Sequence, residues 1–103
     1  MLLITSNDIP GKEFEALGLV SGNTVQSKNV FKDIGAGLRN IVGGEVGSYT
    51  KMLIEARHEA TNRMIAEAEQ MGADAIIMIR YGSSSIMEGA LEMFAYGTAV
   101  KYK

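Results

Sequence analysis

The segment from Tyr49 to Met71 carries two apolar stripes on a single helical pattern. Apolar residues three and four apart are typical of a helix that packs one side on a core. A second apolar set follows the same spacing on a neighbouring arc, while the remaining arc is charged or polar. A small sheet covers one such stripe but hardly two. The first stripe consists of Met52, Leu53, Ala56, Ala60, Met64 and Met71, and the second of Ile54, Thr61, Ile65 and Ala68.

The second stripe has two explanations that the sequence leaves open. A shorter helical pattern, Val30–Ile41, could cover it within one chain. Contact with another subunit would cover it equally well. A chain of 103 residues buries only about 60–70% of the surface of its unfolded form, so association is a common way to complete a small core.

Two predicted strands, Phe14–Gln26 and Leu91–Tyr102, alternate between small and large side chains. Glycine in a strand often marks the close approach of another backbone, so we expect a helix on the small faces. The large faces then point outward and resemble an interface. The small faces hold Ala16, Gly18 and Gly22 in the first strand and Met93, Ala95, Gly97 and Ala99 in the second. The large face of the second strand holds Phe94, Tyr96, Thr98, Val100 and Tyr102.

The predicted fold is α+β: an antiparallel sheet with two helices on one face, in the order β-β-α-α-β-β and as a single domain over 1–103. Ser48 is the expected N-cap of the long helix, and Gly72 is expected to end it. The remaining expected elements are a short strand Met1–Thr5, a strand Ala75–Tyr81 and a turn Gly82–Ser85.

Charge and composition exclude several function classes. The net charge is −2 and the ten Lys and Arg residues are scattered, so we expect neither nucleic-acid nor anionic-membrane binding. The chain has no Cys, which removes disulfides and thiolate metal sites. It has no apolar run near the roughly 20 residues of a membrane span, so the expected location is cytoplasmic. We expect no cofactor and assign no metal ligand.

No catalytic constellation is found. The string His58-Glu59-Ala-Thr-Asn62 has Asn where a zinc protease has its second His, and His58 is the only histidine. The run Ser83–Ser85 has no His nearby in sequence to activate a hydroxyl. No residue is therefore assigned a catalytic role.

Arg57 falls between the two apolar stripes, where a charge is unfavourable unless it is paired. It either extends its head into solvent at a subunit boundary, pairs across the boundary with Glu45 or a strand carboxylate, or faces a pocket. Tyr49 could donate to an anionic ligand in such a pocket. The candidate interface or ligand-pocket residues are Arg57, Tyr49, Glu45, Ile54, Ile65, Phe94 and Tyr96.

Four strings and Ala60 carry a resemblance to a known family. The strings are Leu38-Arg-Asn-Ile-Val-Gly-Gly-Glu-Val-Gly-Ser-Tyr49, Leu53-Ile-Glu-Ala-Arg57, Gly72-Ala-Asp-Ala-Ile76 and Gly97-Thr-Ala-Val100. In this order, over the whole chain, they resemble the YbjQ-like family of small bacterial and archaeal proteins, which carries a heavy-metal-binding label. The resemblance implies an α+β fold related to the dodecin-subunit type and a ring-shaped homo-oligomer, with five copies as the expected number. It implies no established activity.

The sequence therefore predicts a non-enzymatic, ring-forming protein that binds a partner or a small unidentified ligand at its subunit interfaces. A metal-binding module is the alternative that the family label suggests. An enzyme with an inter-subunit site around Arg57 and Tyr49 is a third class.

Overall fold

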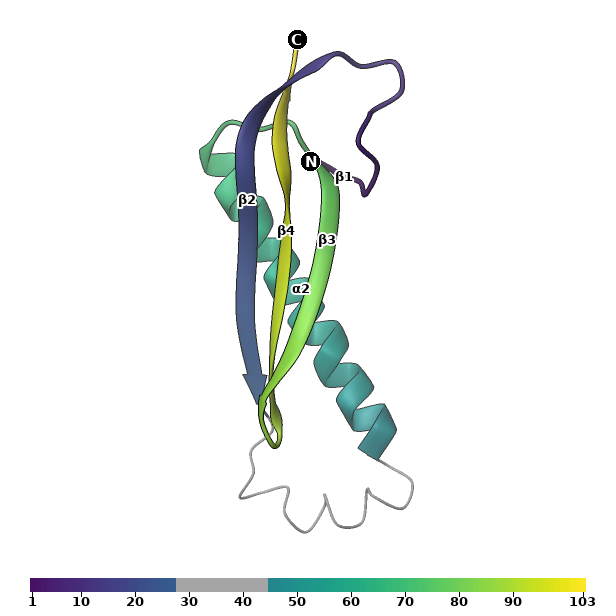
Figure 1. Cartoon of the computed structure of the whole chain (residues 1–103), viewed down its shortest axis with the longest axis vertical. Coiled ribbons are helices and arrows are strands. Elements are labelled where there is room, and N and C mark those ends of the chain that lie inside the picture. Colours follow the sequence, from purple (N-terminus) through teal and green to yellow (C-terminus); the bar gives the residue numbers. More distant parts are fainter. Residues whose placement is uncertain (28–44) are drawn as a thin grey trace.

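A computed structural model describes residues 1–27 and 45–103 of the chain. Within these ranges one long helix crosses one face of a sheet whose three long strands run side by side (Figure 1). The elements are β1 (Leu2–Leu3), β2 (Phe14–Ser27), α2 (Glu45–Gln70), β3 (Ala75–Met87) and β4 (Ala90–Tyr102).

The strand order across the sheet is β1-β3-β4-β2. Strand β4 is central and pairs antiparallel with both β2 and β3, whereas β1 pairs parallel with β3, with Leu2 opposite Ala75. The α+β class is confirmed. The expected antiparallel sheet with two helices is wrong, because the described residues form a mixed sheet and one helix in the order β-β-α-β-β. The expected shorter helix, 30–41, lies outside the described residues.

Two expected boundaries are also wrong. Helix α2 begins at Glu45, so Ser48 is already inside the helix and is not its N-cap. The serine-rich run predicted as a turn is extended within β3, because backbone pairing with β4 holds it in the sheet. The β3–β4 turn lies instead at Glu88 and Gly89, where Gly89 supplies a positive φ of 78°.

The main core lies between α2 and the small side chains of the sheet, as the alternation predicted. A Cβ atom at Gly22 would overlap the carbonyl oxygen of Ala60 and stand 2.5 Å from the amide nitrogen of Met64. The helix backbone therefore rests directly on β2, and this contact fixes which arc of α2 faces outward. The buried residues of this core are Val20, Ala56, Ala60, Met64, Ala68, Ile76, Ile79, Met93, Ala95 and Ala99.

One bulge in β2 and one in β3 change which side chains face the helix. In β2 the register shifts between Ala16 and Gly18. Gly18 therefore lies on the helix side, as expected, but Ala16 lies on the opposite face. In β3 the register shifts beside Met78, a non-glycine residue with φ of 55°.

The N-terminal segment covers one end of the sheet face that points away from α2. Ile9 is buried there against Ala75, Ile77 and Val100, which form a second, smaller core. Figure 1 shows this segment arching from β1 to the start of β2. The prediction that the large face of β4 points outward is therefore confirmed for Tyr96, which is exposed, but wrong for Val100.

Candidate functional site

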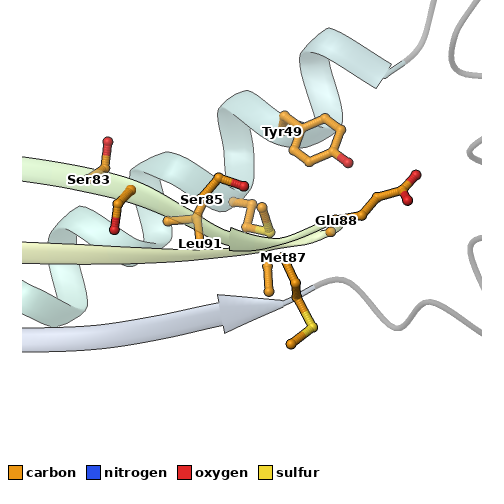
Figure 2. Close-up of a pocket in the computed structure, with 10 residues that line it drawn as sticks. Tyr49, Ser83, Ser85, Met87, Glu88 and Leu91 are labelled. Atoms are coloured by element: carbon orange, nitrogen blue, oxygen red, sulfur yellow. The ribbon is translucent and has the colours of Figure 1, made fainter.

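A cavity of about 410 Å³ opens between the start of α2 and the β3–β4 hairpin. Figure 2 shows the Tyr49 ring projecting from α2 on one side, with Ser83, Ser85 and Glu88 on the hairpin. The lining residues are Tyr49, Met52, Ser83, Ser84, Ser85, Met87, Glu88, Gly89, Ala90 and Leu91.

The lining combines hydroxyl groups, thioethers and one carboxylate. Ser83 and Ser85 bring hydroxyl groups, Met52 and Met87 bring apolar surface, and Glu88 brings a negative charge. Among the described residues, the lining contains no Lys or Arg. Apolar walls with a few polar groups are typical of small-molecule sites, and this set suits a neutral or cationic ligand with hydroxyl groups better than an anion.

The structure separates two residues that the sequence placed in one candidate pocket. Tyr49 lines the cavity, whereas Arg57 does not. Arg57 lies eight residues further along α2, which is about 12 Å along the helix axis. The side chain of Glu45, the third candidate, is outside the described part of the chain, so its pairing with Arg57 stays a prediction.

Arg57 is exposed on the side of α2 that faces β3. The hydroxyl of Thr61, one turn away, is hydrogen-bonded to the Tyr81 hydroxyl of β3 at 2.9 Å. Ile54 on the same side is 43% exposed. Among the side chains that the structure describes, those of residues 1–27 and 49–103, none forms an ion pair or hydrogen bond with the Arg57 guanidinium. We term this surface the α2 flank: Ile54, Arg57, Thr61 and Ile65 of α2, and Tyr81 of β3.

Replacing Tyr81 by phenylalanine tests the polar contact of the α2 flank. The Thr61 hydroxyl donates to the Arg57 carbonyl oxygen at 2.7 Å, which leaves Tyr81 as the donor to Thr61. Tyr81→Phe should therefore lower the free energy of unfolding by about 0.5–1 kcal/mol. Tyr96→Phe is the control, because Tyr96 is similarly exposed without a hydrogen bond to the described residues. Equal melting temperatures of the two variants by circular dichroism would contradict the assignment.

The outer sheet face is the second uncovered surface. It points away from α2 and exposes Leu19 by 72% and Val25 by 60%. Phe94 and Tyr96 stack on it with ring centroids 6.1 Å apart and an interplanar angle of 23°. We define the outer sheet face by these four residues and Glu92.

Glu92 is a residue that the sequence reasoning missed. Its carboxylate lies on the outer sheet face and accepts from Asn23 Nδ2 at 3.3 Å and from Ser84 Oγ at 3.4 Å, so it links three strands. Both donors are neutral. The signal was available, because Glu92 falls on the same alternating face of its strand as Phe94 and Tyr96.

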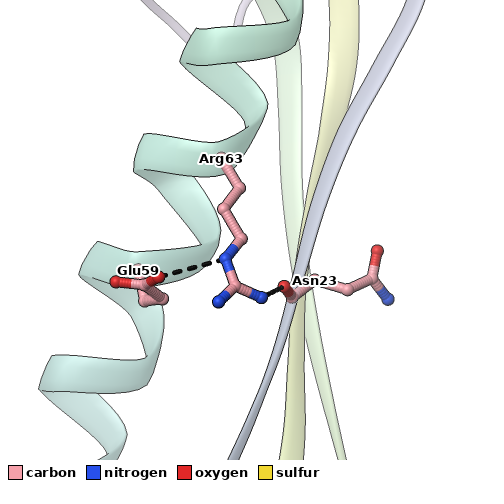
Figure 3. A network of polar contacts seen from close by, with 3 residues as sticks. All are labelled: Asn23, Glu59 and Arg63. Atoms are coloured by element: carbon pink, nitrogen blue, oxygen red, sulfur yellow. Dashed lines mark hydrogen bonds and ion pairs between the residues drawn. The ribbon is translucent and has the colours of Figure 1, made fainter.

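Helix α2 also protects the free edge of β2. Figure 3 shows Arg63 reaching from α2 to the backbone of Asn23. Its Nη1 donates to the Asn23 carbonyl oxygen at 2.6 Å, and its Nε donates to Glu59 Oε1 at 3.0 Å. The charged Arg63 side chain thus lies against edge strand β2 at this point, and charged side chains or a covering helix are common ways to hinder pairing with a further strand.

The described residues form neither a cluster of metal ligands nor a helix that could cross a membrane. The side chains of residues 1–27 and 49–103 include no group of three or more His, Cys, Asp or Glu placed to hold a metal ion. In the same part of the chain, the helix is not apolar enough to cross a membrane.

The chain is similar to known proteins over its whole length. A family model described as "Putative heavy-metal-binding" matches residues 1–103. A UPF0145 protein of Photobacterium profundum is 58% identical over 102 residues, covering 98% of this chain and 99% of that relative. A second, from Clostridium novyi, is 55% identical over 101 residues, covering 98% of each.

The fold has a counterpart among crystal structures. A protein with unknown function from Pediococcus pentosaceus matches with a TM-score of 0.67 at 16% identity, covering 100% of this chain and 98% of the other. At this identity the match supports the fold alone. The family match and the relatives carry the assignment that the sequence motifs predicted: the chain belongs to the YbjQ-like family.

Proposed function

We propose that the chain is the subunit of a ring-shaped homo-oligomer, with five copies as the expected number. The assembly acts by binding a partner or a small ligand at or near its subunit contacts, without catalysing a reaction, and it works in the cytoplasm. The observation that carries the proposal is apolar surface that the described residues leave uncovered on both sides of the sheet.

The uncovered apolar side chains are large and clustered. The outer sheet face exposes Leu19, Val25 and Tyr96, and the α2 flank exposes Ile54 and Tyr81. Single exposed apolar residues are normal on a monomer, but contiguous patches mark interaction sites. Stacked aromatic rings add to this, because aromatic residues are enriched at the centre of protein interfaces.

The elongated shape supports the same proposal. At about 3.3 Å per residue, the 14 residues of β2 extend for about 46 Å. The radius of gyration is 17.2 Å, against about 13 Å for a compact domain of 100 residues. An elongated two-layer subunit has more surface to cover than a compact one, and packing against copies of itself covers it.

The mass in solution tests the assembly. Light scattering on the purified chain at micromolar concentration should give a multiple of the 11.1 kDa subunit, with five copies as the expected value. A stable mass of 11.1 kDa across a dilution series would falsify the assembly. Another closed number of copies would replace only the expected pentamer.

The hairpin cavity is the proposed place for a small ligand. The single imidazole of the chain, His58, is not among its lining residues, so no imidazole base stands beside the Ser83 and Ser85 hydroxyls. This supports binding over hydrolysis. A thermal-shift screen of polyols, sugars and amines should find a stabilising compound, since a ligand at 100 times its dissociation constant adds about 2.7 kcal/mol. Ser85→Val should remove that shift.

The description of the family favours metal binding as a second candidate. Soft heavy metals select thiolate and imidazole ligands, and this chain has no Cys and one His. The donor set of a single chain therefore does not fit such a centre. Metal analysis of protein purified without a His tag decides between the candidates, because a stoichiometric transition metal per subunit would favour the second.

A further inference from the structure

The two uncovered surfaces carry opposite charges in similar apolar settings. The α2 flank has one cation, Arg57, between Ile54 and Thr61 on the side of the helix that faces β3. The outer sheet face has one carboxylate, Glu92, beside Phe94. The same face carries Arg80 opposite Tyr96, and its Nη1 donates to the carbonyl oxygens of Thr5 and Ile79. Within the described residues, neither Arg57 nor Glu92 has an ion-pair partner of opposite sign.

The geometry points to a contact between these two surfaces: the α2 flank of one subunit packs on the outer sheet face of the next, and Arg57 pairs with Glu92 of the partner subunit. This inference rests on the self-assembly proposed above and names the surfaces that carry it. A guanidinium matches a carboxylate in both charge and planar geometry. The pairing also offsets the desolvation free energy of the two charges, which the contact would otherwise bury without partners.

The apolar parts of the two surfaces fit the same contact. Ile54 and Ile65 would cover Leu19, Val25 and Tyr96, so that the sheet lies between its own helix and a helix of its neighbour. Sheets with a helix on each face are a stable layer arrangement. Because the two surfaces differ, every subunit offers one of each, and such head-to-tail contacts close into a ring when the rotation permits it.

Two other ways to cover these surfaces fit less well. Pairing β2 edge to edge with another strand meets the charged Arg63 side chain, which is bound to the Asn23 carbonyl of that strand. Packing two outer sheet faces against each other leaves Arg57 without a partner and, where the two-fold axis passes near Glu92, brings two carboxylates together. Like charges brought close in an interface weaken it.

A charge exchange tests the pair in the full chain. Arg57→Glu and Glu92→Arg should each raise the concentration at which the assembly dissociates by at least about tenfold. The double variant should return it close to the parent value, because the pair is restored with its signs reversed. Lys51→Glu, which reverses an exposed cation on the same helix, should leave it unchanged. Sedimentation velocity over a dilution series measures all four.

Disulfide trapping tests the same contact without depending on charge, because the parent has no Cys. A chain carrying both Arg57→Cys and Glu92→Cys should form a covalent ladder up to the full ring on a non-reducing gel. Dimers from Glu92→Cys alone would overturn the proposal in favour of two outer sheet faces packed together.

The outcomes separate this inference from the self-assembly on which it rests. A parent that is a monomer at every concentration overturns both. A parent that assembles, with an Arg57→Glu variant that dissociates like the parent, overturns the Arg57–Glu92 pair and leaves the assembly standing. The pair is supported if Arg57→Glu and Glu92→Arg each dissociate at a higher concentration than the parent, the double variant dissociates like the parent, and the two cysteines give a covalent ladder.

Discussion

Gly22→Ala should lower the free energy of unfolding by roughly 3 kcal/mol, near the upper end of what an added methyl group costs in a packed core. The methyl group would overlap the Ala60 carbonyl oxygen and stand 2.9 Å from the Arg63 Cβ atom. These are atoms of the helix backbone and of a Cβ fixed to it, so they move only if α2 lifts from β2. Urea unfolding at one fixed protein concentration measures the effect.

Gly82→Ala is the matched control for this substitution. A methyl group at Gly82 would overlap the Phe94 Cζ atom and stand 2.7 Å from Cε2, but these atoms belong to the far end of a side-chain ring. The ring is half-buried at the surface and can turn aside, so the expected cost is about 1 kcal/mol. Equal losses in the two variants would mean that α2 does not rest on β2 at Gly22.

Met64→Ala should destabilise the protein by about 3–4 kcal/mol and lower the melting temperature by more than about 10 °C. Met64 is fully buried between α2 and the sheet, so truncation leaves a cavity in the main core. Two variants calibrate the loss. Met64→Leu keeps most of the volume and should cost less than about 1.5 kcal/mol, whereas Met87→Ala removes a side chain that is 64% exposed and should cost almost nothing. A Met64→Ala variant as stable as Met87→Ala would contradict the position of the core.

The helix and its buried stripe were predictable because their signal is periodic. Ala56, Ala60 and Met64 recur at a spacing that only a helix places on one side, and the alternation of β4 gave the surface that receives them. Met71 is an exception: it follows the last helical residue and is exposed. The continuity of the pattern gave no sign that the helix had ended before it.

The bulges and the serine-rich strand were not predictable in the same way. A single extra residue at Leu17 or beside Met78 leaves the composition unchanged and only shifts the phase of the alternation. Ser83–Ser85 is extended because β4 pairs with it, and such long-range pairing overrides the local preference of serine for turns. The cover that Ile9 gives to the second core is likewise a contact between segments far apart in sequence.

The candidate site was predicted in parts. Tyr49 lines the cavity, and Arg57 lies on an uncovered flank, but the two do not share a pocket. Helical position alone gave the direction of the Arg57 side chain. The carboxylate proposed to meet it, Glu92, depends on how one subunit sits on another, and the periodicity of a single chain contains no information on that.

The bulge at Met78 has a consequence for how β3 tolerates insertions and deletions. Ile77 and Ile79 are two residues apart, yet they belong to cores on opposite faces of the sheet. Met78 is therefore the extra residue at which the inward and outward alternation of β3 side chains is interrupted. Deleting that one residue would make Ile77 and Ile79 neighbours in a regular strand, so Tyr81 would still face α2 and Arg80 would still face away from it. The strand therefore tolerates the loss of a residue at Met78, whereas the loss of a residue from a regular part of β3 would exchange the two faces of the strand beyond it.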